Sequence, residues 1–129
     1  MNQKYNIKDN GENMKKFLIV LIFLNACTVA NKKEFLENIK GKYTLDSDKT
    51  KTVKVSANGR IIHNNIIYTF QEALSSTNAV YLLDDVQYAG LTYNTNTKKL
   101  MEIWATNFDK NSIDWENTSR TRKNIGTKQ

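Results

Sequence analysis

Residues 52–70 read TVKVSANGRIIHNNIIYTF, and this stretch decides the fold class. Its first five residues alternate polar and apolar side chains, a period of two that is typical of a half-buried β-strand. Asn58-Gly59 follows at once, and this pair favours the left-handed backbone of a type I′ hairpin turn. Residues 60–62 then predict a returning strand, His63-Asn64-Asn65 another turn, and residues 66–70 a further strand. The stretch therefore predicts successive antiparallel strands joined by tight turns.

The same period continues on both sides of this stretch. Further strands are predicted at 43–45, 79–83, 89–93, 100–105 and 113–116. A count of about eight short strands at spacings of about ten residues predicts an all-β fold, an antiparallel up-and-down meander closed into a barrel or folded as a sandwich. One short helix is expected in front, over residues 34–40, because Phe35, Leu36 and Ile39 share a helical face and Gly41 ends it.

Composition limits the class of protein further. The chain has 129 residues, of which 40% are hydrophobic and 25% charged, as in an ordinary globular domain. Wholesale disorder and a membrane protein with several spans are therefore excluded. A single cysteine, Cys27, excludes an intramolecular disulfide and any zinc site built from several cysteines.

The N-terminal residues have the pattern of an export signal. Lys15 and Lys16 precede the unbroken apolar run 17–24, and Asn25-Ala26-Cys27 follows. An eight-residue helix covers about 12 Å, whereas the hydrocarbon core of a bilayer is about 30 Å thick, so a spanning anchor is not expected. We predict a signal-peptide helix within residues 1–26, with residues 1–13 either an over-extended start or a long polar leader.

Leu24-Asn25-Ala26-Cys27 resembles the lipobox of bacterial lipoproteins. The resemblance implies cleavage between Ala26 and Cys27, lipid attached to Cys27, and a protein held at a membrane by that lipid. Residues 27–33 would then form a short lipidated tether. Thr28 is not the aspartate associated with inner-membrane retention, so the outer membrane of a bacterial envelope is the expected location. In the alternative interpretation Cys27 merely ends a buried apolar segment.

A second resemblance concerns the domain that follows. A short helix, then Gly41-Lys42-Tyr43 opening a strand, then a strand series ending near Arg120 or Arg122, resembles a small lipocalin-like (calycin-type) domain of the kind found in bacterial, including spirochaetal, envelope lipoproteins. The resemblance implies a β domain over residues 34–123. It also implies that Tyr43 takes the place of a family tryptophan and that Arg120 or Arg122 covers its ring to close the barrel.

Aromatic side chains are the candidate ligand contacts. In one interpretation they fill the core, and in the other some of them line a cavity or groove for an apolar or glycan ligand. Trp104 is the best candidate for exposure because Glu102 and Thr106 share its strand face, whereas Met101, Ile103 and Ala105 form an apolar face. The candidates are Tyr68, Phe70, Tyr81, Tyr93, Trp104 and Trp115.

Catalytic motifs are absent from the sequence, which contains neither Gly-x-Ser-x-Gly nor a glycine-rich phosphate loop. His63 is the only histidine and is expected as an exposed turn residue, and Asp84-Asp85 is expected as a hairpin turn. Residues 124–129 are expected as a solvated basic tail, or as one that contacts acidic lipid headgroups or glycans.

These patterns together predict a non-enzymatic, lipid-anchored envelope protein. We expect a monomer without metal or cofactor that binds a small apolar ligand or a protein partner, or serves as a surface antigen. The alternative is an accessory or inhibitor protein that acts on another envelope protein through a loop. The predicted mature chain is only mildly basic, so a nucleic-acid partner is not expected.

Overall fold

The structure, a computed structural model, describes residues 28–105, 107–115 and 122–129. Residues 28–39 are helical, and a 3₁₀ turn, η1, covers Lys110–Ser112. The strands are β1 Gly41–Leu45, β2 Thr52–Val55, β3 Ile61–His63, β4 Ile66–Ala73, β5 Asn78–Leu83, β6 Gln87–Asn94, β7 Lys99–Trp104 and β8 Arg122–Lys128.

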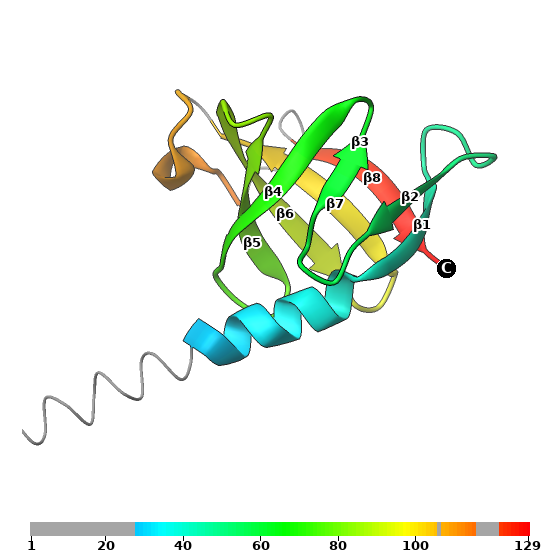
Figure 1. The fold of residues 1–129 in the computed structure, drawn as a ribbon, viewed down its shortest axis with the longest axis horizontal. Coiled ribbons are helices and arrows are strands. Elements are labelled where there is room, and N and C mark those ends of the chain that lie inside the picture. Colours follow the sequence, from blue (N-terminus) through cyan, green and yellow to red (C-terminus); the bar gives the residue numbers. More distant parts are fainter. Residues whose placement is uncertain (1–27, 106, 116–121) are drawn as a thin grey trace, which may run out of the picture.

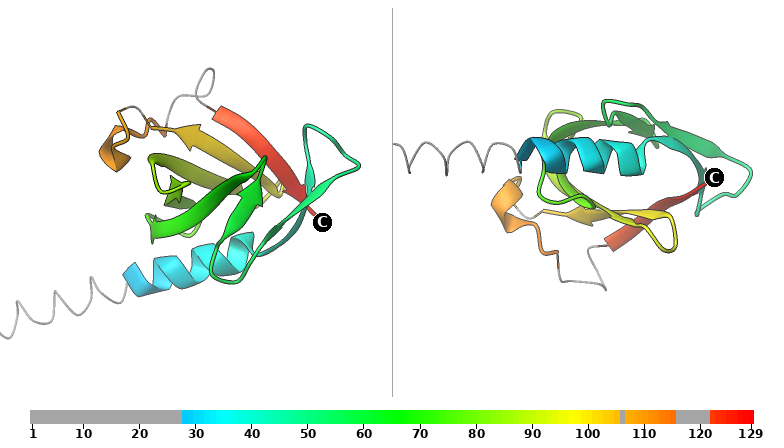
Figure 2. Two further views of the ribbon diagram at one scale, coloured as in Figure 1. Left: turned by 45° about the horizontal axis from the view of Figure 1, so that its top comes forward. Right: turned by 90° about the horizontal axis from the view of Figure 1, so that it is seen from below.

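All eight strands form one antiparallel sheet in the order β2-β1-β8-β7-β6-β5-β4-β3. Strands that follow one another in the chain lie side by side, except at β2 and β3, which are the two ends of the sheet. The sheet curls round so that these ends approach each other, giving a nearly closed barrel (Figure 1, Figure 2). The predicted all-β, up-and-down barrel with one helix in front is therefore confirmed.

The helix lies across one end of the barrel (Figure 1). Phe35 and Ile39 are fully buried, so the apolar stripe of the helix joins the barrel core. Two polar contacts hold its C-terminal end: the Tyr43 hydroxyl donates to the Ile39 carbonyl at 2.7 Å, and Lys128 Nζ donates to the Asn38 carbonyl at 2.7 Å. A cation at this position also favours the negative end of the helix dipole.

Helical structure extends further than the sequence indicated. The helix was expected only over residues 34–40, but residues 28–33, predicted as a tether, are helical as well. Lys32 and Lys33 occupy the exposed face of this amphipathic helix.

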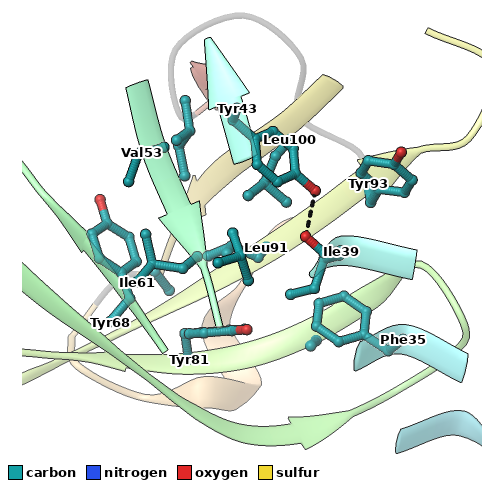
Figure 3. Close-up of a cluster of buried hydrophobic side chains, with 14 of the residues drawn as sticks. Phe35, Ile39, Tyr43, Val53, Ile61, Tyr68, Tyr81, Leu91, Tyr93 and Leu100 are labelled. Atoms are coloured by element: carbon teal, nitrogen blue, oxygen red, sulfur yellow. Dashed lines mark hydrogen bonds between the residues drawn. The ribbon is translucent and has the colours of Figure 1, made fainter. Parts of the chain in front are cut away.

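The barrel interior is packed with large side chains (Figure 3). Alternate residues of each strand point inward, as in Tyr43 and Leu45 of β1 or Ala79, Tyr81 and Leu83 of β5. Each large apolar side chain buried in this way contributes about 1.5–3 kcal/mol of transfer free energy. Fully or almost fully buried members of this core include Phe35, Ile39, Tyr43, Val55, Ile61, Tyr68, Tyr81, Leu91, Leu100 and Ile125.

Two hairpin turns have the left-handed pair that a type I′ turn requires. Asn64 and Asn65 have φ of 53° and 64°, and they join β3 to β4. Asp84 and Asp85 have φ of 50° and 61° and join β5 to β6, so the hairpin turn predicted there is confirmed.

The type I′ turn predicted at Asn58-Gly59 is wrong. Of these two residues only Gly59 has a positive φ, 86°. Gly59 N donates to the Ser56 carbonyl at 2.9 Å, and Ser56 N donates to the Arg60 carbonyl at 3.1 Å. These bonds define a three-residue loop in which a type I turn is followed by a left-handed glycine.

The C-terminal residues form a strand inside the sheet, not at one of its edges. β8 pairs with β1 on one side and β7 on the other, so the basic tail predicted for residues 124–129 is wrong for 124–128, and the barrel extends beyond residue 123. Ile125 is the one large apolar residue of this strand, so the sequence lacks the alternation of polar and apolar residues by which a strand is predicted. Gly126 allows β1 to lie close, because a Cβ there would be 2.6 Å from the Thr44 carbonyl oxygen.

The strand predicted at 113–116 is also corrected. Ile113 makes an isolated bridge with Ala105, and η1 precedes it. This segment packs on the outer face of the barrel, where Ile113 joins Val80, Ile103 and Ala105 in a second, smaller apolar cluster.

Candidate functional site

The candidate aromatic residues separate into three locations. Tyr68, Tyr81 and Tyr93 are buried in the barrel core, with Phe70 packed against it. Phe70 and Tyr81 meet edge to face with ring centroids 5.7 Å apart, and the Tyr81 hydroxyl donates to the Gly59 carbonyl at 2.8 Å. These rings contact each other and the backbone, so they act as core residues of the barrel.

The two tryptophans lie away from this core. Trp104 ends β7 and is 38% exposed. Trp115 packs on the outer cluster, over Gly90 of β6, where a Cβ would lie 2.6 Å from the indole Cη2. The six candidates therefore do not line one common wall.

The end of the barrel opposite the helix contains a buried polar cluster that sequence reasoning missed. The Tyr68 hydroxyl on β4 donates to Glu102 Oε1 on β7 at 2.5 Å. Glu102 is 1% exposed, and the adjacent His63 on β3 is 5% exposed, with its ring centroid 6.4 Å from that of Tyr68. Because β4 and β7 are not neighbours in the sheet, the Tyr68–Glu102 bond ties opposite walls of the barrel together.

This cluster corrects two predictions. His63 is an inward-facing strand residue, not an exposed turn residue, because β3 continues one residue beyond its isoleucines. Glu102 also points inward together with Leu100, whereas Ile103 and Ala105 belong to the outer cluster. Trp104 is exposed as predicted, but for a different reason. It follows Leu100 and Glu102 in the inward-facing row of β7 and lies at the end of that strand.

Burial sets the electrostatics of the cluster. It raises the pKa of Glu102, an effect opposed by the Tyr68 hydrogen bond and by Lys123. It lowers the pKa of His63, and the positive charge of Lys123 acts in the same direction. The pKa of Tyr68 is raised, first by burial and then by its bond to Glu102. The acid and the imidazole are almost inaccessible, so the contacts described support a role in holding the barrel together.

Of the predicted barrel-closing residues, the structure describes the side chain of Tyr43. The Tyr43 ring is buried beside Tyr93, with centroids 6.4 Å apart. Lys128, the β8 residue directly opposite Tyr43, lies with Nζ 5.7 Å from the centre of the Tyr93 ring. Arg122 pairs with Ile103 at the other end of β8, about 20 Å along the strand from Lys128, and its side chain lies outside the described part of the structure.

Several predicted residues lie outside the described part of the chain. These are the signal peptide, the cleavage site at Ala26 and Cys27, and Arg120. In the described ranges, no helix is long and apolar enough to cross a membrane. The same residues contain no group of three or more His, Cys, Asp or Glu side chains placed to hold a metal ion.

The outer surface carries several exposed apolar side chains. Ile62 and Ile67 are 53% and 38% exposed and stand directly opposite each other on β3 and β4. Val86 follows the β5–β6 turn, and Phe108 lies in the loop before η1; they are 69% and 62% exposed.

Comparison with models of protein families, with curated proteins and with solved structures found no match to this chain.

Proposed function

We propose that the protein is a non-enzymatic, lipid-anchored protein of the bacterial envelope whose barrel binds a protein partner through its outer surface. The observation that carries the choice of a partner over an enclosed ligand is the filled interior. Tyr43, Tyr68 and Tyr81 occupy the barrel with their hydroxyls bonded to groups of the protein itself. Exposed apolar residues are found on the outside instead.

The position of the helix agrees with lipid attachment at Cys27. That cysteine directly precedes residue 28, the first described helical residue, and residues 28–39 span about 18 Å as a helix. A lipid on Cys27 would hold the helix-covered end near the bilayer. The Asn64-Asn65 and Asp84-Asp85 turns at the other end would then face away from it.

The anchor is tested on the full chain expressed in a bacterium. We expect a mature protein that begins at Cys27 and has the added mass of acyl chains, and a Cys27→Ser variant that is neither cleaved nor acylated. An unmodified thiol in the mature native protein would refute the anchor.

Partner binding is tested separately, in cells, with a photo-crosslinking amino acid placed at one exposed position at a time. We expect protein adducts from one or more of Ile62, Val86 and Phe108, and none from Lys98, an exposed residue of the β6–β7 turn. The partner function is abandoned if all three apolar positions give no adduct.

A further inference from the structure

The barrel is interrupted between β2 and β3, and we define this interruption as the seam. β2 and β3 are consecutive in the chain but form the two ends of the sheet, and no ladder joins them. Figure 1 shows both strands rising from the loop at residues 57–59 and diverging. The backbone bond from Ser56 N to the Arg60 carbonyl lies at the loop, where the two strands are closest.

The alternation of hydrogen bonding shows which β2 backbone groups face the seam. Leu45 N donates to the Lys51 carbonyl at 3.0 Å, and the register continues with Tyr43 opposite Val53. In an antiparallel ladder every second residue is bonded to a given neighbour, so Val53 is bonded to β1. The N–H and C=O of Thr52 and Lys54 therefore point away from β1, into the seam.

The same reasoning applies to β3. The two-residue turn makes His63 and Ile66 a bonded pair, so the backbone of Ile62 points away from β4. Ile67, opposite Ile62, confirms this, since its carbonyl accepts from Asp84 N on the β5 side at 2.9 Å. The seam thus has outward-facing backbone groups on both of its edges.

These edges border a shallow groove of about 350 Å³, and its lining is basic and partly apolar. Lys54 and Arg60 are exposed, and Lys42 on β1 is the direct partner of Lys54, so the basic side chains are concentrated here. Ile62 and Ile67 form an exposed apolar pair at the β3 edge. The lining residues are Thr52, Val53, Lys54, Ser56, Arg60 and Ile62.

From this geometry we propose that the seam binds an extended segment of a partner protein in which acidic residues alternate with apolar ones. The segment pairs with the β2 edge through the backbone of Thr52 and Lys54. Its acidic side chains lie on the outer face with Lys54 and Arg60, and its apolar side chains, on the opposite face of the strand, meet Val53 of the groove lining. This inference rests on the proposed partner function and names the surface and the chemistry of the partner. The competing explanation is that basic side chains at a free edge only prevent pairing with other strands.

The test uses a seven-residue peptide of alternating Glu and Val, with blocked ends, added to the purified full chain. We expect NMR shift changes at the Thr52, Lys54 and Ile62 amides, and slower hydrogen exchange at the Thr52 and Lys54 amides. Two control peptides separate the contributions. A Lys-Val peptide tests charge, and a Glu-Val peptide N-methylated on the bonding edge tests backbone pairing. Each should bind at least about tenfold more weakly, the equivalent of about 1.4 kcal/mol.

Charge reversal tests the same site from the protein side. The double variant Lys54→Glu, Arg60→Glu should weaken binding of the Glu-Val peptide at least about tenfold and improve binding of the Lys-Val peptide. Lys98→Glu, on a turn at the middle of the strand order, should change neither. Both positions are exposed, and the amide spectrum reports directly whether the variants remain folded.

Three results would overturn the proposal: no binding of the Glu-Val peptide, binding that N-methylation leaves unchanged, or binding that charge reversal leaves unchanged. If the Glu-Val peptide does not bind, the basic side chains at the seam serve only to prevent pairing with other strands. Crosslinks in cells from Val86 or Phe108, together with any of these results, leave the partner function standing and remove the seam from it.

Discussion

Replacing Tyr68 with phenylalanine removes one hydroxyl and leaves the ring that fills the barrel. That hydroxyl donates to Glu102 at 2.5 Å, and Glu102 is 1% exposed. When the carboxylate is charged, the lost bond is one to an ion, and Tyr68→Phe should destabilise the fold by about 2 kcal/mol. When the carboxyl is protonated, the bond is one between neutral groups and the destabilisation should be about 1 kcal/mol.

The direction of the pH dependence follows from the raised pKa of Glu102. Between the ordinary value of 4.5 and the raised folded value, the native state binds more protons than the unfolded state, so the free energy of unfolding falls as pH rises. The hydrogen bond from Tyr68 lowers the pKa of Glu102. Its removal therefore raises this pKa further and widens the pH range over which the free energy of unfolding falls. The destabilisation by Tyr68→Phe should therefore be greater at pH 8 than at pH 5.

The measurement is urea unfolding followed by tryptophan fluorescence, on wild type and variant at each pH. Tyr81→Phe is the matched control, because its buried hydroxyl donates to the backbone carbonyl of Gly59, a group that does not titrate. It should cost about 1 kcal/mol at both pH values. Burial lowers the pKa of His63, and this histidine is present in every protein compared. If Tyr68→Phe has the same effect at pH 5 and pH 8, the buried charge on Glu102 is refuted.

The other predictions concern the sheet, the histidine and the tryptophans. Gly126→Ala should destabilise the fold by about 3 kcal/mol in urea unfolding, because its Cβ would lie 2.6 Å from a backbone oxygen of Thr44; a loss below about 1 kcal/mol would contradict the close β1–β8 contact. Because burial lowers the pKa of His63, the free energy of unfolding should fall as the pH drops from the ordinary value of 6.5 toward the folded value. His63→Asn should remove this part of the pH dependence. An unchanged dependence of the free energy of unfolding on pH would contradict the burial of His63. The variant Trp115→Phe retains only Trp104, which is 38% exposed, and the variant Trp104→Phe retains only Trp115. Iodide should quench the fluorescence of the first variant more strongly than that of the second. Equal quenching would contradict the exposed position of Trp104.

The fold could be predicted because alternation and turn residues are local signals. Residues 52–70 contain β2, β3 and the first part of β4 with the turns between them, and the structure has all of these. The loop conformation at Asn58-Gly59 could not be predicted, because type I′ turns and three-residue loops both use a left-handed glycine. Which of the two forms depends on how far β2 and β3 diverge, and that is set by the whole barrel.

The buried polar cluster and β8 could not be predicted for a related reason. Glu102 lies on a strand face with a polar sequence, and its burial is made tolerable by the Tyr68 hydroxyl on the opposite wall and by the charge of Lys123. β8 has one large apolar residue, Ile125, and its place comes from the two strands it pairs with. Contacts between residues this far apart in sequence have no local pattern.

The position of β8 also determines how the barrel can assemble. β8 lies between β1 and β7, so the β1–β2 pair stays separate from the sheet of β3 to β7 until β8 pairs with both. Because β1 and β8 lie about eighty residues apart in sequence, this pairing carries a large loop-closure cost and is expected to be the slow step of folding.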